Sequence, residues 1–529
     1  MSIIKIPYQN TGFYSKLIVD YLNQDENLKQ FYNRFPSIDE FANQIIEKES
    51  NYNSNHRRLL VEVLKDQYRQ INTSEETIQN IESLSSDKTF TITTGHQLNL
   101  FTGPLYFLYK IVSTINLCEE LREKYPDYNF VPIYWMATED HDFDEINFFK
   151  FKDQKVSWNS DQTGGVGRFS TNGLDDVFEQ FSSLIVESNN AEYLRKLFEK
   201  AYVDHDNLAD ATRYLANELF KDYGLVIVDA DNPKLKTTLI PHITNELLDN
   251  RAANAVRKTN SLLAEYSIQV NPRDINLFYL HEGIRERIVF EHETYSVLNT
   301  DISFTKDEIL SEVQKYPERF SPNVLIRPLY QEVLLPNLCY IGGGGELAYW
   351  LQLKSYFDES EVSFPILLLR NSVQVISTKQ RNKLGKLNIS LEELFLKQKE
   401  LLDKKVKENS GLELTFSDKI SFLQNQFDDL KKVTGQTDSS FIGAVNAQEK
   451  KQINGLKKLE KRLLKAEKRR LQDLVTRITT IQNQLLPNGG LEERQRNFSE
   501  YYLEYGPEFI RRIKNDLKPL EGAFSILEF

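Results

Sequence analysis

The amino-acid sequence predicts an α/β protein in which an open parallel β-sheet with inserted segments precedes a long α-helical antiparallel coiled coil. Three observations support this fold class. Short apolar runs rich in β-branched residues end abruptly at Gly-rich, acidic or polar residues, as buried parallel strands do at the edge where such sheets bind ligands. Helical patterns separate these runs, which is typical of βα units. Residues 381–486 lack proline and are rich in Leu, Lys, Glu and Gln.

The length and composition are those of a globular protein with more than one domain. At 529 residues the chain exceeds the roughly 250–300 residues at which single hydrophobic cores stop growing. Its 40% hydrophobic and 27% charged residues are ordinary for such proteins. We predict a core with a helical cover and inserts at residues 1–380, a coiled-coil domain at 381–486, and a segment at 487–529 that packs back on the core.

Charge and cysteine content narrow the possible partners. The net charge of −12 argues against general binding to nucleic acid or to an anionic membrane. Cys118 and Cys339 are the only cysteines, too few for a disulfide framework or a zinc site, which fits a reducing compartment. The chain starts without a signal-peptide pattern, and no apolar run approaches the roughly 18 residues of a membrane span. We therefore expect a cytoplasmic protein without nucleic-acid or membrane partners.

The first part of the chain, residues 1–88, is predicted to form the helical cover. Its phrases DEFANQIIEKE and HRRLLVEVLKDQYRQI space apolar residues three and four apart, as amphipathic helices do. The loop SLSSD then leads into Thr89–Thr94, an apolar and β-branched run that we predict to be the first buried strand.

A polar turn follows this strand and leads into a predicted helix. Thr102 is expected to cap the helix, with Pro104 in its first turn, where a missing N–H costs nothing. The helix N-terminus would direct N–H groups and a partial positive charge into the crevice, which favours a phosphate or carboxylate. The residues expected to hold such an anion are Gly95, His96, Gln97, Thr102 and Gly103.

An acidic run follows the second predicted strand, Val131–Ala137. Five carboxylates and one histidine stand within seven residues: Glu139, Asp140, His141, Asp142, Asp144 and Glu145. Acidic runs are often solvated loops, and that interpretation stays open. The position directly after a buried strand favours a binding or catalytic site.

The middle of the chain is predicted to hold inserts and a third parallel strand. The phrase TGGVGRFS is expected to form a hairpin turn, because no strand-to-helix context supports a phosphate loop. GLVIVDAD, residues 224–231, has the form of a buried strand with an acidic end. Residues 265–305 alternate short strands with turns and are predicted to form a small insertion.

Residues 321–357 contain two further sets of candidate site residues. Asn323, Arg327 and Gln331 recur every four residues and would share one helix face, although Pro328 makes a helix doubtful until after it. The run Gly342–Gly345 precedes another helix, where it would let backbone N–H groups approach an anion or serve as a tight packing turn.

A fourth strand is predicted at residues 364–372. Its polar end, Arg370 and Asn371, should join the same crevice as the other strand ends.

The coiled coil is predicted to be an antiparallel hairpin that closes between about residues 410 and 445. Its seam is a heptad pattern with one irregular step, after Ala466. The seam residues are Leu456, Leu459, Leu463, Ala466, Leu471, Leu474, Ile478, Ile481 and Leu485. Residues 450–470 contain ten Lys or Arg against two Glu. We interpret this run as a solvated face, with a surface for nucleic acid or an acidic partner as the alternative.

The groups at the predicted crevice suit activation of a carboxylate and its transfer to an amine. Carboxylates would hold Mg²⁺ or a substrate ammonium, and N–H groups and Arg would hold phosphate or carboxylate. The motifs GxxxxGK[ST], GxSxG and HExxH are missing from the sequence, which argues against a Walker ATP site, an α/β-hydrolase and a zinc protease.

Several long blocks resemble the cysteine-adding enzymes of bacillithiol biosynthesis. They are GHQLNLFTGPLY with Lys110, WMATEDHDFDEI, SPNVLIRPLYQEVLLP, GGGGELAYWLQLK and NGGLEERQRNF followed by YYLEYG. The resemblance implies a Rossmann-like core similar to class I nucleotidyltransferases and aminoacyl-tRNA synthetases, and a coiled coil that pairs two subunits. It implies condensation of cysteine with the amine of glucosaminyl malate, and a nucleotide pocket for ATP or ADP. The carboxylates at the strand ends add Mg²⁺ as a possible cofactor.

Strand-end positions and these blocks together give the expected site residues. The catalytic group, expected to orient the amine or the ammonium of cysteine, comprises Glu139, Asp140, His141 and Asp142. The substrate-binding group comprises Gly95, His96, Gln97, Thr102, Gly103, Lys110, Asn323, Arg327, Gln331, Gly343, Gly345, Glu346, Arg370 and Asn371. No dedicated protein ligand set for a metal is expected.

The sequence departs from the family pattern at two positions. His96 stands where Gln is common, which argues against a general-base role, and Gly344 stands where Pro is usual. A KMSKS-type loop is not evident in the sequence, so ATP-dependent adenylation is not established by it. The alternative function is a nucleotide-binding coiled-coil scaffold that recruits the true ligase.

Overall fold

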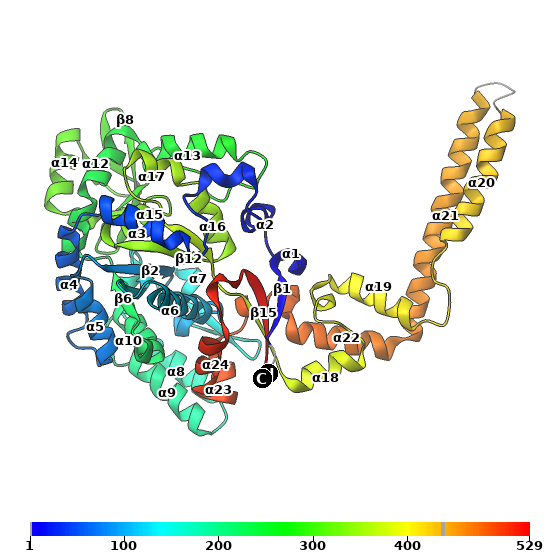
Figure 1. The fold of residues 1–529 in the computed structure, drawn as a ribbon, viewed down its shortest axis with the longest axis horizontal. Helices are drawn as coiled ribbons and strands as arrows, with labels where there is room; N and C mark the ends of the chain where they lie inside the picture. Colours follow the sequence, from blue (N-terminus) through cyan, green and yellow to red (C-terminus); the bar gives the residue numbers. More distant parts are fainter. Residues whose placement is uncertain (1–2, 435–439) are drawn as a thin grey trace.

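The centre of the molecule is a five-stranded parallel sheet. The computed structural model describes residues 3–434 and 440–529 (Figure 1). The strand order is β13-β12-β2-β3-β6, and all four pairings are parallel. The strands are β2 (Thr89–His96), β3 (Asn129–Met136), β6 (Val226–Asp229), β12 (Asn337–Gly342) and β13 (Ile366–Leu369). Four of them are the predicted strands, and β12 adds a fifth that leads into the predicted glycine turn. The parallel α/β core is confirmed.

Both faces of this sheet are covered. Ile366 and Leu368 on β13 belong to one buried apolar cluster, and Leu367 and Leu369 belong to the other. Side chains that alternate between two cores are characteristic of a strand buried on both faces. The helix α6 (Tyr106–Lys124) packs across β2 and β3, and α3 (Glu40–Asn51) packs against β12. Cys118 and Cys339 are both buried and free.

The N-terminal region is mostly helical, as predicted, but its first residues form a strand. The helices are α1 (Tyr8–Thr11), α2 (Lys16–Leu22), α3, α4 (Asn55–Gln67) and α5 (Glu75–Ser83). The prediction of helix from the first residue is wrong at β1 (Ile4–Pro7), which pairs antiparallel with β15 (Ala523–Glu528). β15 also pairs parallel with β14 (Val373–Ile376). No local pattern could reveal β1, because its partner is at the other end of the chain.

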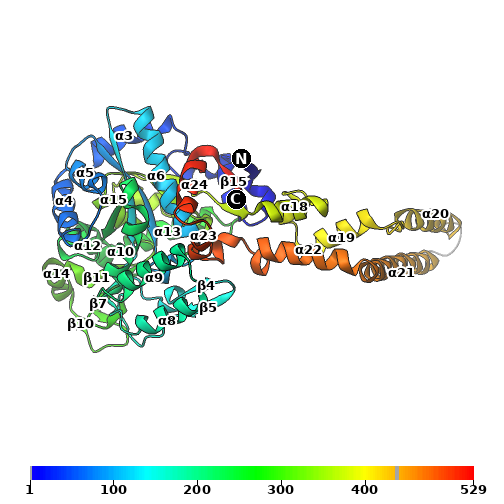
Figure 2. The same ribbon diagram turned by 90° about the horizontal axis from the view of Figure 1, so that it is seen from below.

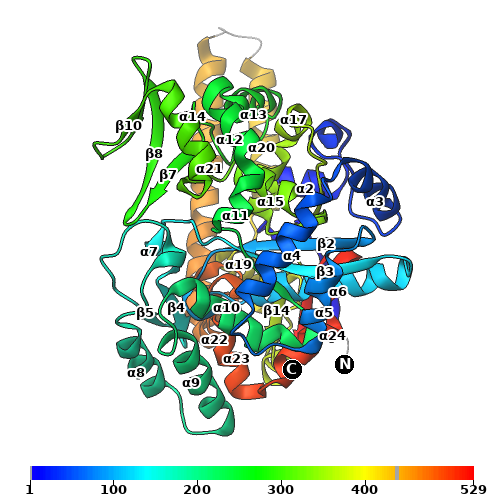
Figure 3. The ribbon, with the colours of Figure 1, turned by 90° about the vertical axis from the view of Figure 1, so that its left-hand side faces the viewer.

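The inserts form two small β-structures and a group of helices. β4 (Phe148–Phe151) and β5 (Gln154–Ser157) make a hairpin. Five antiparallel strands in the order β10-β9-β8-β7-β11 confirm the predicted insertion, visible at the upper left of Figure 3. These strands are β7 (Leu277–His281), β8 (Ile284–Glu291), β9 (Thr294–Val297), β10 (Ser303–Phe304) and β11 (Phe320–Pro322). The helices here are α8 (Leu174–Leu184), α9 (Asn189–Tyr202), α10 (Leu208–Phe220), α11 (Pro233–Lys236), α12 (Ile240–Asp249), α13 (Arg251–Leu262) and α14 (Lys306–Lys315).

The prediction of a hairpin turn at TGGVGRFS is wrong. The hairpin turn lies at Lys152 and Asp153, both with positive φ. The Gly-rich segment instead contains a short 3₁₀ helix, Val166–Arg168, that packs against the loop after β3. A Cβ on Gly167 would lie 2.6 Å from the Cβ of Thr138. Only glycine allows this close approach, so the segment is glycine-rich because of its packing.

The coiled-coil arm projects away from the core (Figures 1 and 2). Its helices are α18 (Thr378–Lys386), α19 (Gln398–Asn409), α20 (Ser417–Thr434), α21 (Ser440–Arg470) and α22 (Gln472–Leu485). α20 and α21 pack side by side as an antiparallel pair, while α19 packs against α22. The connection between α20 and α21, where the predicted hairpin closes, lies outside the described residues. None of the helices in the described ranges has the length and hydropathy of a membrane span.

The predicted seam divides into two halves at its irregular step. α21 ends at Arg470 and Leu471 lies outside both helices, with φ −97° and ψ 34°. In α22, Ile478 and Ile481 are 0% and 2% exposed within their own chain. On the α20–α21 arm, by contrast, several apolar side chains remain uncovered: Phe422, Leu430, Val433, Phe441 and Leu459 are 50–65% exposed.

The C-terminal segment contacts both the core and the three-stranded sheet. Its helices are α23 (Phe498–Tyr505) and α24 (Glu508–Asp516), and α24 packs against α6. Asn497 donates hydrogen bonds to the carbonyls of Phe101 and Gly103, at 2.7 and 2.6 Å. Glu492 accepts from the Gln374 side chain at 2.7 Å and from the Val375 N–H at 3.2 Å. The segment therefore supports the loop that follows β2.

Glu492 gives the fold a pH dependence that can be measured. Burial raises the pKa of this carboxyl from 4.5 to about 7, against the opposing charge of Arg496. The folded state therefore holds a proton that the unfolded chain loses, and this stabilisation falls as pH rises from about 4.5 to 7, by on the order of 3 kcal/mol. We expect urea unfolding to show this fall in the wild type but not in Glu492→Gln. Glu504→Gln, an exposed position of the same segment, should retain it; an equal fall in Glu492→Gln would contradict the assignment.

Candidate functional site

A cavity of about 270 Å³ lies at the carboxyl ends of β2, β3 and β12. The helices α15 (Arg327–Leu334) and α16 (Gly344–Leu351) contribute to its wall. Eight expected site residues line it: Gly95, His96, Gln97, Lys110, Asp140, Arg327, Gln331 and Glu346. The chain therefore brings residues from five separate segments of the sequence to one edge of the sheet, where open α/β folds bind ligands.

Aromatic side chains that the sequence did not indicate complete the cavity. They are Tyr106, Trp135, Tyr340, Tyr349 and Trp350. Tyr340 and Trp350 stack with ring centroids 4.5 Å apart. In the sequence these aromatic residues look like ordinary core positions of strands and helices. Because they stand near the ends of those elements, where the cavity lies, that position could have indicated that they line the site.

Lys110 and Glu346 form an ion pair in the cavity wall. Lys110 Nζ lies 2.6 Å from Glu346 Oε1 and also donates to the Gly95 carbonyl at 2.7 Å. The Tyr340 hydroxyl donates to Glu346 Oε2 at 2.7 Å. Burial lowers the pKa of Lys110, and the charge of Glu346 opposes this effect. The pair joins α6 to the first turn of α16 and fixes the Gly95 carbonyl between them.

Breaking this pair should destabilise the protein. Lys110→Met would leave the Glu346 carboxylate, 27% exposed, without its partner. We expect a loss of about 2 kcal/mol in the free energy of unfolding, less than for a fully buried pair. Glu346→Gln in the same chain should recover part of the loss, which urea unfolding of the two single variants and the double variant would measure. Strictly additive losses would show that the two side chains are not coupled.

Asp140 is the carboxylate of the acidic loop that lines the cavity. Its Oδ2 lies 3.6 Å from Arg327 Nη1 and accepts from Gln97 Nε2 at 3.4 Å. Burial alone would raise the pKa of Asp140. The charges of Arg327 and Arg285, with the His141 backbone N–H, which donates at 2.9 Å, together lower that pKa below its usual range. Asp140 is therefore an anion placed beside a cation, and the two present opposite charges to a ligand.

The Gly-rich segment after β5 holds the acidic loop in place. The N–H of Val166 donates to the Asp140 carbonyl at 2.7 Å, and the N–H of Gly167 donates to the Thr138 carbonyl at 2.8 Å. These bonds fix the backbone on both sides of Glu139. The sequence showed the glycines but not their role in positioning this loop.

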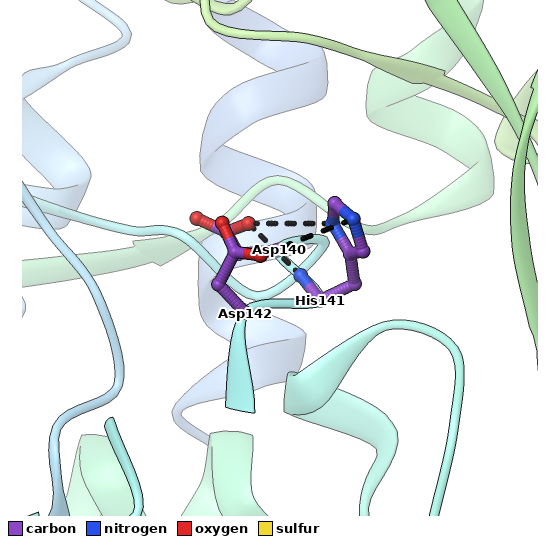
Figure 4. Close-up of side chains that lie close together, drawn as sticks. All are labelled: Asp140, His141 and Asp142. Atoms are coloured by element: carbon purple, nitrogen blue, oxygen red, sulfur yellow. Dashed lines mark hydrogen bonds and ion pairs between the residues drawn. The ribbon is translucent and has the colours of Figure 1, made fainter. Parts of the chain in front are cut away.

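His141 and Asp142 lie beside Asp140 but do not line the cavity (Figure 4). Asp142 Oδ1 is 4.0 Å from His141 Nε2, and Asp140 Oδ1 is 3.7 Å from His141 Nδ1. Arg285 Nη1 lies 2.5 Å from the same Nδ1. His141 is therefore contacted by Arg285 at Nδ1, while its side chain remains 42% exposed.

These three residues are the group of potential metal ligands found among the described residues, with ligand atoms within 4.8 Å of one another. They do not fit a resident Mg²⁺. Mg²⁺ requires octahedral oxygen ligands, but one of the three groups is an imidazole whose Nδ1 faces Arg285. Asp140 is paired with Arg327. Two guanidinium groups at the cluster oppose the charge of a cation.

His96 is buried beneath the cavity as a neutral side chain. Its ring packs against Tyr106 and Phe107, with centroids 5.4 and 5.0 Å away. Burial, with the charges of Lys110 and Arg370, holds the pKa of His96 well below its usual range. Within the described part of the chain, Nε2 has no hydrogen-bond partner. A neutral imidazole whose Nε2 has no partner in the protein can form a hydrogen bond with a ligand through that nitrogen.

Other expected site residues lie outside the cavity because they have structural partners. Glu139 is buried in an ion pair with Lys236. Arg370 pairs with Glu493 at 2.7 Å, and Asn371 accepts from the Ser113 hydroxyl at 2.9 Å. These contacts join the parallel sheet to α11 and to the C-terminal segment.

Asn323 also lies outside the cavity. Helix α15 begins at Arg327 with Pro328 in its first turn, so the expected helix face shared by three residues is wrong for Asn323. Asn323 instead donates to Asn276 at 3.0 Å. Arg327 and Gln331, one turn apart, both face the cavity.

The loop after β2 does not cap the next helix, α6, in the way that the sequence predicts. α6 begins at Tyr106, and Leu105 precedes it without a side-chain cap. The expected capping by Thr102 is wrong, because Thr102 belongs to a 3₁₀ turn, Leu100–Thr102, with φ +69°. Thr102 and Gly103 do not line the cavity.

The glycine turn before α16 has the expected form. Gly343 precedes the helix and Gly345 lies in its first turn. A Cβ on Gly342 would lie 2.8 Å from the Tyr340 ring, so the turn passes close to the aromatic wall. Gly343 and Gly345 are not among the lining residues, and Glu346 is the residue of this turn that reaches the cavity.

Comparisons with known proteins relate the chain to one family. The family model described as "Bacillithiol biosynthesis BshC, N-terminal Rossmann-like domain" matches residues 1–371. A second, "Bacillithiol biosynthesis BshC, C-terminal coiled-coil domain", matches residues 373–529. The boundary between the two lies at β14, the strand that follows the parallel sheet.

Relatives with the name "Putative cysteine ligase BshC" match over nearly their whole length. The protein of Flavobacterium johnsoniae is 55% identical over 522 residues, and that of Flavobacterium psychrophilum is 56% identical over 524, each covering 99% of both chains. The protein of Cytophaga hutchinsonii is 40% identical over 98% of this chain and 97% of its own. A solved structure titled "putative arginyl t-RNA synthetase" of Campylobacter jejuni covers 84% of this chain and 98% of its own, with a TM-score of 0.22 and 8% identity, too low to bear on the fold.

Proposed function

Because the chain belongs to the BshC family of bacillithiol biosynthesis, we propose that it is a cytoplasmic ligase that joins L-cysteine to the amine of glucosaminyl malate. The product would be bacillithiol, and the step would be the last of that pathway. The reaction forms one amide bond between the cysteine carboxyl carbon and the sugar amine, and an oxygen of the carboxyl group leaves.

The observation that carries this proposal is the pairing of Asp140 with Arg327 at the cavity. The two side chains present opposite charges 3.6 Å apart, which suits a zwitterionic amino acid or an amine beside a carboxylate. Asp140 would bind the ammonium of cysteine. Arg327 and Gln331 would bind the malate or the activated carboxylate, with the loop Gly95–Gln97 as the floor of the site.

Activation of the cysteine carboxyl by ATP is part of the proposal and remains a prediction. A carboxylate does not react with an amine at a useful rate until its oxygen becomes a better leaving group, and a nucleotide would supply this chemistry. Mg²⁺ would then arrive on the phosphate oxygens, since the group Asp140, His141 and Asp142 does not fit a resident ion. The residues of this chain would bind and orient the two substrates.

The test is reconstitution with purified protein. We expect bacillithiol, identified by mass, from cysteine, glucosaminyl malate and ATP with Mg²⁺. Serine in place of cysteine tests selectivity for the thiol, and omission of ATP tests the activation step. Product without nucleotide would disprove ATP-dependent activation. Repeated failure with correctly folded protein would favour a nucleotide-binding scaffold that recruits another ligase.

We also propose that two copies pair through the coiled-coil arm. The support is the group of exposed apolar side chains on α20 and α21, which includes Phe422 and Val433 at 65% and 62% exposure. Apolar side chains on a coiled-coil helix are normally covered by a partner helix. A second copy of the same arm would cover them.

A further inference from the structure

Arg285 connects the inserted antiparallel sheet to the acidic loop. It belongs to β8 and its side chain is only 6% exposed. Its Nε donates to the Ser321 hydroxyl at 3.1 Å, and its Nη2 donates to the Pro322 carbonyl at 3.4 Å. The guanidinium carbon lies 4.1 Å from the centre of the Phe278 ring. With these contacts in place, the remaining Nη1 is directed at His141.

The contact with His141 has one chemical interpretation. Nη1 of Arg285 and Nδ1 of His141 are 2.5 Å apart, and a guanidinium has donors but no acceptor. Burial and the charge of Arg327 lower the pKa of Arg285 to about 10, so Arg285 is still protonated at neutral pH. Nδ1 must therefore accept the hydrogen bond with its lone pair, and a neutral His141 carries its proton on Nε2.

The surroundings of His141 would otherwise favour a different state. Asp140 Oδ1 lies 3.7 Å from Nδ1 and Asp142 Oδ1 lies 4.0 Å from Nε2. A carboxylate oxygen accepts from an N–H, so Asp140 would favour a proton on Nδ1 and Asp142 one on Nε2. Phe278, whose ring centroid is 5.4 Å from that of His141, packs against both His141 and Arg285. Arg285 is thus the group that prevents a proton on Nδ1.

We propose that Arg285 is a positioning residue that fixes His141 as the Nε2–H tautomer, so that His141 donates a hydrogen bond and Asp140 alone receives the substrate ammonium. The tautomer is a property of the free protein. The role in catalysis rests on the proposed function, in which the Nε2–H would donate to a carboxylate or phosphate oxygen of a substrate that extends from the cavity to the acidic loop. His141 is then not the base that removes a proton from the attacking amine.

The tautomer is tested by ¹⁵N solid-state NMR of the whole protein labelled at histidine. His141→Gln identifies the His141 signals by difference among the seven histidines. We expect an unprotonated Nδ1 and a protonated Nε2 in the wild type. Arg285→Lys keeps a donor without an acceptor and should preserve this pattern, whereas Arg285→Met should put a proton on Nδ1. Arg287→Met, a matched change on the same strand, should leave the spectrum unchanged.

Two results would overturn the proposal: a protonated Nδ1 in the wild-type protein, or an unprotonated Nδ1 that persists in folded Arg285→Met. Circular dichroism checks the fold of each variant. If Arg285→Met does not fold, the wild-type and Arg285→Lys spectra still decide, because a protonated Nδ1 in either contradicts the inference.

Steady-state kinetics of the Arg285 variants distinguish a failure of the positioning role from a failure of the proposed function. Arg285→Met should lower kcat/KM for cysteine addition by roughly tenfold to a hundredfold, the range expected when a site residue is slightly misplaced, and Arg285→Lys should recover much of it. If the tautomer shifts but kcat/KM does not, the role in the reaction is wrong. If the wild type shows the expected tautomer and forms no product, the proposed function fails while the hydrogen-bond assignment holds.

Discussion

Replacing Asp140 with Asn is expected to lower kcat/KM for cysteine addition by roughly a hundredfold or more while the fold is retained. The two side chains have nearly the same shape, but Asn has no charge to attract an ammonium group. Truncating one partner of a buried charge pair between two binding partners costs about 2–5 kcal/mol of binding free energy, and each 1.4 kcal/mol corresponds to a factor of about ten in kcat/KM. The change also leaves Arg327, 3.6 Å away, without its counter-charge.

The matched control for this prediction is Asp142→Asn. Asp142 belongs to the same loop, but its side chain is 57% exposed and does not line the cavity, so its loss should change kcat/KM by less than about tenfold. Steady-state kinetics with cysteine as the varied substrate, and thermal unfolding of both variants, complete the measurement. A folded Asp140→Asn protein with normal kinetics would remove Asp140 from the proposed mechanism.

Placing Glu at both Phe422 and Leu459 is expected to convert the proposed dimer into a monomer. These side chains, on α20 and α21, are 65% and 52% exposed in one chain, and a partner arm would bury them. Each buried apolar side chain contributes about 1.5–3 kcal/mol, and each substitution is present in both subunits. The dimer dissociation constant should therefore rise by at least about a thousandfold. Sedimentation velocity across a range of protein concentrations would measure it.

Val186→Glu is the matched control, since Val186 is 73% exposed and lies after α8, outside the arm. It should leave the mass unchanged. A dimer that persists in the Phe422→Glu/Leu459→Glu protein would place the contact elsewhere. The seam residues of α22 are unsuited to this test, because Ile481 is already buried inside its own chain, and Glu there would disturb the fold of one subunit.

The sequence predicted most of the parallel sheet because each strand carries a local signal. Val131–Ala137 is a continuous apolar run with an acidic end, and such runs indicate strands buried on both faces. β1 could not be predicted in this way, since its partner β15 lies at the other end of the chain. The break at Leu471 did have a signal, namely the irregular step in the heptad seam, although its consequence for the two helices became evident only in three dimensions.

For the candidate site, position in the sequence indicated which loops meet but not where each side chain points. Asp140 and Glu139 are neighbours in one acidic run, yet Asp140 lines the cavity and Glu139 is paired with Lys236. Arg370 ends a predicted strand, and its partner Glu493 lies more than a hundred residues later. Arg285 had no signal at all, because nothing local to β8 shows that its side chain reaches His141.

The pairing of β1 with β15 has a consequence for how the protein is made. Ile4 is opposite Ile526, so β1 cannot pair until the residues of β15 have been translated. At about 5–20 residues per second this wait is roughly half a minute or longer. Asn497, which donates to the carbonyls of Phe101 and Gly103, is also translated long after the loop that it supports, since it follows Phe101 by 396 residues. The nascent chain can build its parallel sheet early, but the loop beside the cavity gains its support only after Asn497 has been translated. A chain terminated before that residue would carry the core without the support for that loop.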